Sequence, residues 1–175
     1  VSIDFLVCVN DLVLEQSAED ILKVPEPKFL SSRSAKLFPP RDDVYYLGFL
    51  PGYGFSRDPR AGVWEGHTVT FVAMQLAYFM GFSEVVLVGV DHNFAMKGKP
   101  NEEILMDRDD ESHFAPNYFP PGMRWHLPDL ENSEIAYRIA KVAFERDGRR
   151  IFDATVGGQL QVFPKVDYRK HFGVK

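Results

Sequence analysis

The fold is decided by Glu84-Val85-Val86-Leu87-Val88-Gly89-Val90-Asp91, a stretch in which apolar residues follow one another without alternation. Such a continuous apolar run is typical of a parallel strand that is buried on both faces. Ligands bind to parallel sheets outside the carboxyl ends of the strands. We therefore predict a buried central strand over residues 84–90 and an active site just beyond it, at residues 89–93.

Strands and helices alternate around this stretch. Apolar and β-branched composition predicts strands over residues 3–9, 28–31, 44–50 and 151–152. Apolar residues at helical spacing predict helices over residues 12–24 and 68–80, and a third helix with Asn132 or Ser133 as its N-cap. This alternation predicts an α/β fold, with a mostly parallel sheet flanked by helices, in a single domain that spans residues 1–175.

Composition and charge limit the partners. The net charge of −5 argues against electrostatic binding to nucleic acid or to an anionic membrane, so a small-molecule ligand is expected. The single cysteine, Cys8, lies in an apolar run and is predicted to be a core thiol rather than a nucleophile. The longest apolar stretch, near residues 69–82, is too short for a membrane span, and no targeting signal opens the sequence. We expect a cytoplasmic protein.

A long connection follows the central strand. Residues 92–129 are rich in Pro, Asn, Asp, Gly and aromatic residues and show no sustained period. Long connections of this kind are uncommon in a compact domain and are usually functional. We predict that this connection is a lid or a substrate loop.

The polar residues that end the central strand are the first binding candidates. Asp91, His92 and Asn93 could bind ribose hydroxyls, a metal or a phosphate at the mouth of a parallel sheet. The alternative is a strand end whose polar groups cap the neighbouring backbone. We favour the functional interpretation because a long loop follows.

A second candidate is the start of the helix over residues 68–80. Gly66-His67-Thr68 leaves free backbone amides beside the Thr68 hydroxyl, which together form a candidate phosphate site. Thr70 is compatible both with this site and with a plain helix cap, and the two interpretations stay open.

The long connection carries the candidates for catalysis. His126 could deprotonate a hydroxyl, and the adjacent Arg124 could hold negative charge, with Trp125 between them. His113 is a weaker candidate for a substrate contact. The alternative for each histidine is a loop side chain that bonds only the backbone.

A metal site is not predicted. Four neighbouring carboxylates invite a divalent cation, but a solvated charge run is the favoured interpretation of Asp107, Asp109, Asp110 and Glu111. The sequence has no Cys and His set at zinc spacing, no Gly-Lys-Ser/Thr phosphate loop and no Gly-x-Ser-x-Gly elbow. Several classes of enzyme are thereby excluded.

Taken together, several stretches carry a resemblance to a known family. They are residues 66–78, 80–85, 89–94, 124–128, 133–137 and 153–158. The chain resembles the MptE-like (6-hydroxymethylpterin diphosphokinase-like) domains of bacterial surface-polysaccharide loci, which are distantly related to bacterial sialyltransferases that use CMP-sialic acid. The resemblance covers about residues 5–172 and implies a Rossmann-like nucleotide-binding fold.

The resemblance also implies roles for particular residues. Asp91 matches an Asp that helps to bind the nucleotide in the sialyltransferases, and His126 lies nearest the position of their general base. Asn93 and Phe94 stand where those enzymes carry tyrosines that contact the departing phosphate, so the donor sugar stays open. Such proteins also begin with a strand and a Gly-Asn-Gly-Pro-Ser-like loop, so the resemblance predicts that this chain is N-terminally incomplete and lacks the first strand of its sheet.

Three functions follow as alternatives. The first is a sialyltransferase-like glycosyltransferase in surface-glycan synthesis, with a nucleotide-sugar donor, a glycan or small-molecule acceptor and no required cofactor. The second is pyrophosphoryl transfer from ATP to 6-hydroxymethyl-dihydropterin, in which Mg²⁺ would bridge phosphates and carboxylates. The third is a non-catalytic binding module. The sequence leaves the oligomeric state open, a homo-oligomer included.

Overall fold

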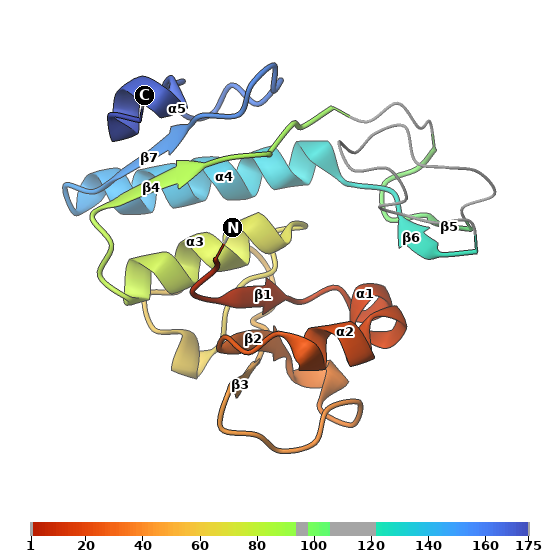
Figure 1. Ribbon diagram of the computed structural model, residues 1–175. Coiled ribbons are helices and arrows are strands. Elements are labelled where there is room, and N and C mark those ends of the chain that lie inside the picture. The colour runs from red at the N-terminus through yellow and green to blue at the C-terminus, as the bar shows by residue number, and fades with distance from the viewer. Residues whose placement is uncertain (1, 94–97, 106–121, 175) are drawn as a thin grey trace.

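The computed structural model describes residues 2–93, 98–105 and 122–174 (Figure 1). Within them, three parallel strands form one sheet in the order β1 (Leu6–Cys8), β2 (Lys28–Ser31) and β3 (Val44–Leu47). Two short helices, α1 (Asp11–Gln16) and α2 (Ala18–Lys23), connect β1 to β2. The single helix expected over residues 12–24 is therefore wrong, since the chain breaks at Ser17, whose φ of −121° is not helical.

A second parallel sheet pairs β4 (Glu84–Leu87) with β7 (Arg150–Asp153). The predicted strand thus forms and is parallel, but it ends at Leu87 rather than at residue 90, and within the described residues it pairs with β7 alone instead of lying in the centre of a sheet. The expectation that residues 84–90 are buried on both faces is wrong, because Leu87 is buried whereas Val88, just beyond the strand, is 62% exposed.

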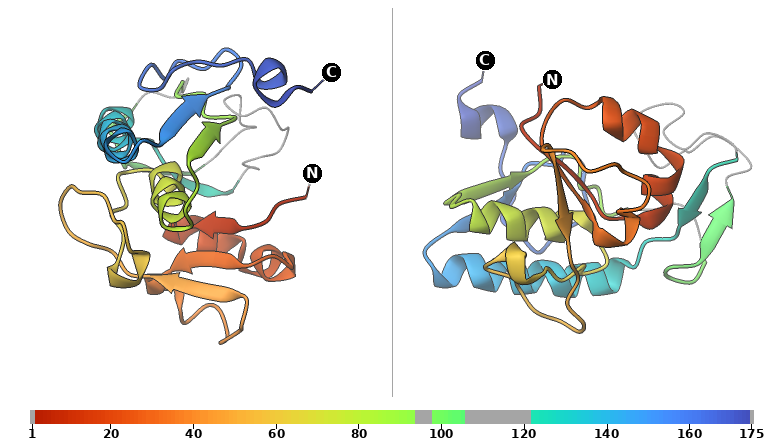
Figure 2. Two further views of the ribbon diagram at one scale, coloured as in Figure 1. Left: turned by 90° about the vertical axis from the view of Figure 1, so that its left-hand side faces the viewer. Right: turned by 90° about the horizontal axis from the view of Figure 1, so that it is seen from below.

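Helix α3 (Val69–Phe79) lies beside both sheets and joins them (Figure 2). Val72 and Leu76 pack with residues of β1 and β3, whereas Phe71, Met74 and Tyr78 pack with β4, β7 and α4 (Leu130–Arg146). Within the described residues, β1 pairs with β2 and β4 pairs with β7, so the parallel strands form two small sheets. The prediction of an α/β fold with mostly parallel strands is confirmed at this level. The additional first strand stays a prediction.

The long connection contains more structure than its sequence suggested. Strands β5 (Glu103–Leu105) and β6 (Arg124–His126) pair antiparallel beyond the N-terminal end of α4 (Figure 1). Strands of three residues are too short to show a period, which explains why residues 92–129 resembled a structureless loop.

Helix α4 starts earlier than expected. Its N-cap is Asp129, not Asn132 or Ser133, and the Asp129 carboxylate accepts a hydrogen bond from the Asn132 amide at 3.1 Å. The remaining elements are a helix near the C-terminus and two 3-10 helices, namely α5 (Tyr168–Phe172), η1 (Ser32–Ser34) and η2 (Pro59–Ala61). Among the described residues, no helix has the length and apolar character needed to cross a membrane.

Candidate functional site

Two adjoining pockets open at the carboxyl ends of β1 and β4. The larger has a volume of about 550 Å³ and the smaller about 280 Å³. The two pockets share four lining residues, which are His67, Thr68, Val69 and Pro128. We therefore treat them as the large end and the small end of one cleft, which meet at the start of α3.

The small end contains the run that follows β4. Gly89, Val90, Asp91, His92 and Asn93 all line it, as the prediction of a site at this edge requires. The C-terminal part of the chain holds the run in place, because the Val90 amide donates to Thr155 Oγ1 at 3.0 Å and Gln159 donates to the Asp91 carbonyl at 2.8 Å.

His92 is attached to α4. Its Nε2 lies 3.2 Å from a carboxylate oxygen of Glu134, and its side chain is only 8% exposed. The hydrogen bond from Arg138, and then the one from His92, outweigh burial and lower the pKa of Glu134 below its ordinary value. His92 therefore lines the small end and also connects residues 89–93 to α4.

Hydroxyl groups cover the floor of the small end. Thr68 is the N-cap of α3, and its Oγ1 accepts from the Thr70 amide and lies 3.3 Å from the Tyr137 hydroxyl. Burial raises the pKa of Tyr137, although hydrogen bonds with Thr68 and Thr70 oppose that effect. Tyr137 therefore stays neutral at physiological pH, and its hydroxyl can donate a hydrogen bond to an anionic ligand.

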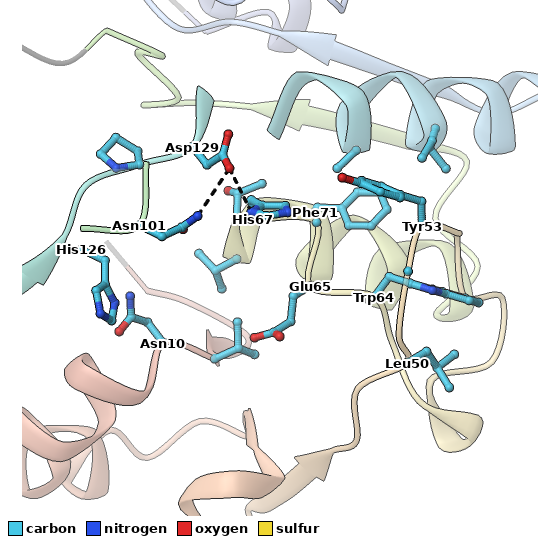
Figure 3. A pocket seen from close by; sticks show the side chains of 18 of the residues that line it. Asn10, Leu50, Tyr53, Trp64, Glu65, His67, Phe71, Asn101, His126 and Asp129 are labelled. Atoms are coloured by element: carbon cyan, nitrogen blue, oxygen red, sulfur yellow. Dashed lines mark hydrogen bonds and ion pairs between the residues drawn. The ribbon is translucent and has the colours of Figure 1, made fainter. Parts of the chain in front are cut away.

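The large end is assembled from segments that are distant in sequence (Figure 3). Tyr53 and Trp64 provide aromatic surface on one side, and Asn10, Glu65 and His126 provide polar groups elsewhere in the lining. Arg33 donates to Glu65 at 2.6 Å, which holds that carboxylate in place. The lining is therefore rich in aromatic rings and hydrogen-bond acceptors, a combination suited to a ligand that carries hydroxyl groups.

His67 and Asp129 form a pair at the junction of the two ends (Figure 3). Nδ1 of His67 lies 3.4 Å from Oδ2 of Asp129, a residue that is 5% exposed. Burial alone would raise the pKa of Asp129, but the hydrogen bonds from Asn132, the electrostatic interaction with His67 and the hydrogen bond from Asn101 together lower it. Asp129 is therefore a buried carboxylate at neutral pH.

The backbone is strained around the cleft. Among the described residues, the non-glycine residues with a positive φ are His67 at 59°, His92 at 52° and Asn101 at 63°. Each of them lines the cleft. Such conformations are uncommon for residues with a Cβ and cluster at functional sites, so they support the assignment of the site.

The residues around β6 separate into two groups. His126 and Trp125 line the large end, and His126 lies 3.8 Å from Glu103. Arg124 lines neither end and instead pairs with Glu15 at 2.8 Å, so the structure does not bring it to the cleft. The predicted contact His113 and the acidic run over residues 107–111 lie outside the described residues.

Several residues of the cleft were not predicted from the sequence. They are Asn10, Tyr53, Trp64, Asn101 and Asp129, and the role of His67 in pairing was also missed. One signal was available for Asp129, which precedes a helical pattern directly after Pro128, as N-cap residues do. In the part of the chain that the structure describes, no group of three or more His, Cys, Asp or Glu side chains is arranged to hold a metal ion.

Comparisons with known proteins do not extend these assignments. No protein-family model, no curated protein and no solved structure matches the chain. The geometry of the cleft therefore carries the functional argument.

Proposed function

We propose that this chain is a Rossmann-like, nucleotide-binding glycosyltransferase that moves a sugar from a nucleotide donor to a hydroxyl of a glycan or small-molecule acceptor. The observation that carries the proposal is the two-ended cleft at the carboxyl ends of the parallel strands. A transferase has to hold two substrates with their reacting atoms adjacent, and the two ends meet at the start of α3.

The donor would occupy the small end. The carboxylate of Asp91 accepts hydrogen bonds from ribose hydroxyls, in the way that acidic residues at strand ends do in nucleotide-binding folds. The hydroxyls of Thr68 and Tyr137, 3.3 Å apart, and the first amides of α3 would face the phosphate. Asn93 and Thr70 complete this end.

The acceptor would occupy the large end. The rings of Tyr53 and Trp64 offer flat apolar surface, and Glu65 and Asn10 accept hydrogen bonds from hydroxyl groups. His126, which the sequence predicts to be the general base on the acceptor hydroxyl, also lines this end.

A second candidate is pyrophosphoryl transfer from ATP to a pterin alcohol. The observation that favours it is the acidic lining, with Asp91 at the small end and Glu65 and Asp129 at the large end, because carboxylates are ligands of Mg²⁺. The charge balance favours the first candidate. Neither lining contains Lys or Arg among the described residues, so a triphosphate would meet more uncompensated repulsion than a sugar nucleotide with one or two phosphates.

Titration calorimetry with a panel of nucleotides and nucleotide sugars tests the proposal. We expect a nucleotide sugar to bind without Mg²⁺, and Asp91→Ala to weaken that binding about tenfold, or about 1.4 kcal/mol. The matched control is Asp20→Ala, which removes a carboxylate that is 80% exposed and lies in α2. Binding of ATP that requires Mg²⁺ would support the second candidate, and the absence of binding by any nucleotide would support a non-catalytic module.

A further inference from the structure

His67 is the ionisable residue that lines both ends of the cleft. His126 lines the large end alone, on a strand at the edge of the cleft. A general base has to reach the acceptor hydroxyl at the point where the acceptor meets the donor. The position of His67 satisfies this requirement, and that of His126 does not.

Asp129 faces one nitrogen of the His67 imidazole, since its Oδ2 lies 3.4 Å from Nδ1. A carboxylate only accepts hydrogen bonds, so it favours the tautomer of His67 that has the proton on Nδ1. This leaves Nε2 as the acceptor, and it has no hydrogen-bond partner among the described residues. Asp129 is itself fixed by Asn132, whose amide and side chain donate to it at 3.1 and 2.8 Å.

The backbone also holds His67 at the junction. Gly66 and His67 both have left-handed φ values, 58° and 59°, and Thr68 then caps α3. The Ser133 hydroxyl, whose shorter hydrogen bond of 2.7 Å goes to the Asp129 carbonyl, also lies 3.4 Å from the His67 carbonyl, which places this turn beside the first turn of α4. Two helix starts therefore position the His67 and Asp129 pair.

His126 lacks comparable support. The two imidazoles are exposed to a similar extent, 34% for His67 and 41% for His126, but their carboxylates differ, because Glu103 lies 3.8 Å from His126 and is 47% exposed whereas the side chain of Asp129 is 7% exposed. A mobile, exposed carboxylate fixes an imidazole less well, and a general base requires a fixed geometry.

We infer that His67, oriented by Asp129, is the general base of the transfer reaction, and that His126 is not. The inference rests on the proposed function. Nε2 of His67 takes the proton of the acceptor hydroxyl while the oxygen forms a bond to the anomeric carbon of the donor sugar. The bond between that carbon and the nucleotide's phosphate oxygen breaks, and its electron pair leaves with the phosphate. With water in place of the acceptor, the same step is hydrolysis of the donor.

The test compares three variants in donor hydrolysis, with CMP-sialic acid, UDP-glucose, UDP-N-acetylglucosamine and GDP-mannose as probes. We expect His67→Gly to lower kcat at least about 100-fold with KM changed less than about threefold, and His126→Gly, which alters the lining of the acceptor end, to lower kcat less than about tenfold. Glycine suits the positive φ of residue 67, so the variant keeps the backbone and opens space for added imidazole. We expect imidazole to restore at least about tenfold of the lost rate in His67→Gly and to leave His126→Gly unchanged.

Asp129→Asn tests the positioning role. Asn retains an N-cap oxygen but loses the charge that stabilises a protonated imidazole, so we expect a fall in kcat with little change in KM and no rescue by imidazole. Nitrogen NMR of the wild-type imidazole supplies a readout that needs no turnover, because the inference requires the tautomer with the proton on Nδ1 of His67.

The outcomes separate the inference from the proposed function. If the donor binds and is hydrolysed but His67→Gly retains the wild-type kcat, or if the proton is found on Nε2, the inference fails and the proposed function stands. If no probe binds to or is hydrolysed by the wild-type protein, both fail.

Discussion

The two ends of the cleft are built in different ways. The small end is lined by three segments of the chain, which are residues 89–93 after β4, residues 67–70 at the start of α3, and Pro128, Leu130, Ser133 and Tyr137 at the start of α4. The large end draws its lining from more segments, which are the end of β1, the loop after β3, the turn before α3, the chain before β5, β6 with the chain after it, and α4. Both ends depend on tertiary contacts, but the small end has a part of its own, residues 89–93, that the large end does not share.

This difference predicts how far the effect of a substitution should extend through the cleft. A change that disturbs only residues 89–93 should affect little beyond the small end, because none of these five residues lines the large end. A change at the junction should affect both ends, since α3, α4 and the turn before α3 meet there. Substitutions at the shared turn should therefore have larger effects than substitutions that disturb residues 89–93 alone.

Gly66→Ala should have the largest effect, because it disturbs the turn that the two ends share. A Cβ at this position would lie 2.3 Å from Cδ1 of Phe71 and 2.7 Å from the Cβ of Ala136, in a backbone with a φ of 58°. We expect a loss of about 3 kcal/mol in the free energy of unfolding, measured by urea denaturation.

The matched control is Gly148→Ala. Gly148 has a similar φ of 69° but no atom within 4 Å of the added Cβ, so only the conformational cost of about 1 kcal/mol should appear. Equal losses in the two variants would mean that the junction is not tightly packed.

Asp129→Ala should have the next largest effect, at the large end. It removes the N-cap of α4 and leaves Asn101 and Asn132 without their acceptor. We expect a loss of about 2 kcal/mol, and less than about 1 kcal/mol for Asp129→Asn, by thermal or urea unfolding.

The same carboxylate predicts a pH dependence. Because its pKa is lowered in the folded state, the stability contributed by its ionisation is complete above about pH 4 and is lost as pH falls through the lowered pKa. Asp129→Asn should therefore be less sensitive to pH than the wild type below about pH 4. Parallel curves for the two proteins would contradict this assignment.

Thr155→Val should have the smallest effect and should be confined to the small end. It removes the acceptor of the Val90 amide, a hydrogen bond of 3.0 Å, and should cost about 1 kcal/mol. Thr155→Ser retains the hydroxyl and is the control. Hydrogen exchange should show faster exchange around Val90 in Thr155→Val and no change around Asp129, and a change at both would mean that the effect extends to the large end.

The sequence predicted the local elements better than their assembly. The extent of α3 was predicted to within one residue at each end, because its apolar run, its Thr68 cap and Gly81 are all local signals. Residues 84–90 were expected to be buried on both faces, yet Val88 within that range is exposed. An apolar residue does not by itself indicate whether another element of the protein covers it.

The candidate site shows the same difference between local features, which could be predicted, and tertiary contacts, which could not. The edge at Asp91 could be predicted because strand pattern and strand end are adjacent in sequence. The pairing of His67 with Asp129 could not, because it depends on how the starts of α3 and α4 are brought together in space. Neither the periodicity nor the composition of the sequence indicates a contact of this kind.

Helix α3 also acts as a spacer. One of its faces packs with the β1 side of the molecule through Val72 and Leu76, and another packs with the β4 side through Met74 and Tyr78. The width of the cleft between Asn10 and Asp91 is therefore set by side-chain volumes in the interior of the protein, away from any ligand. Core residues that never touch a substrate would thus decide how large a substrate fits.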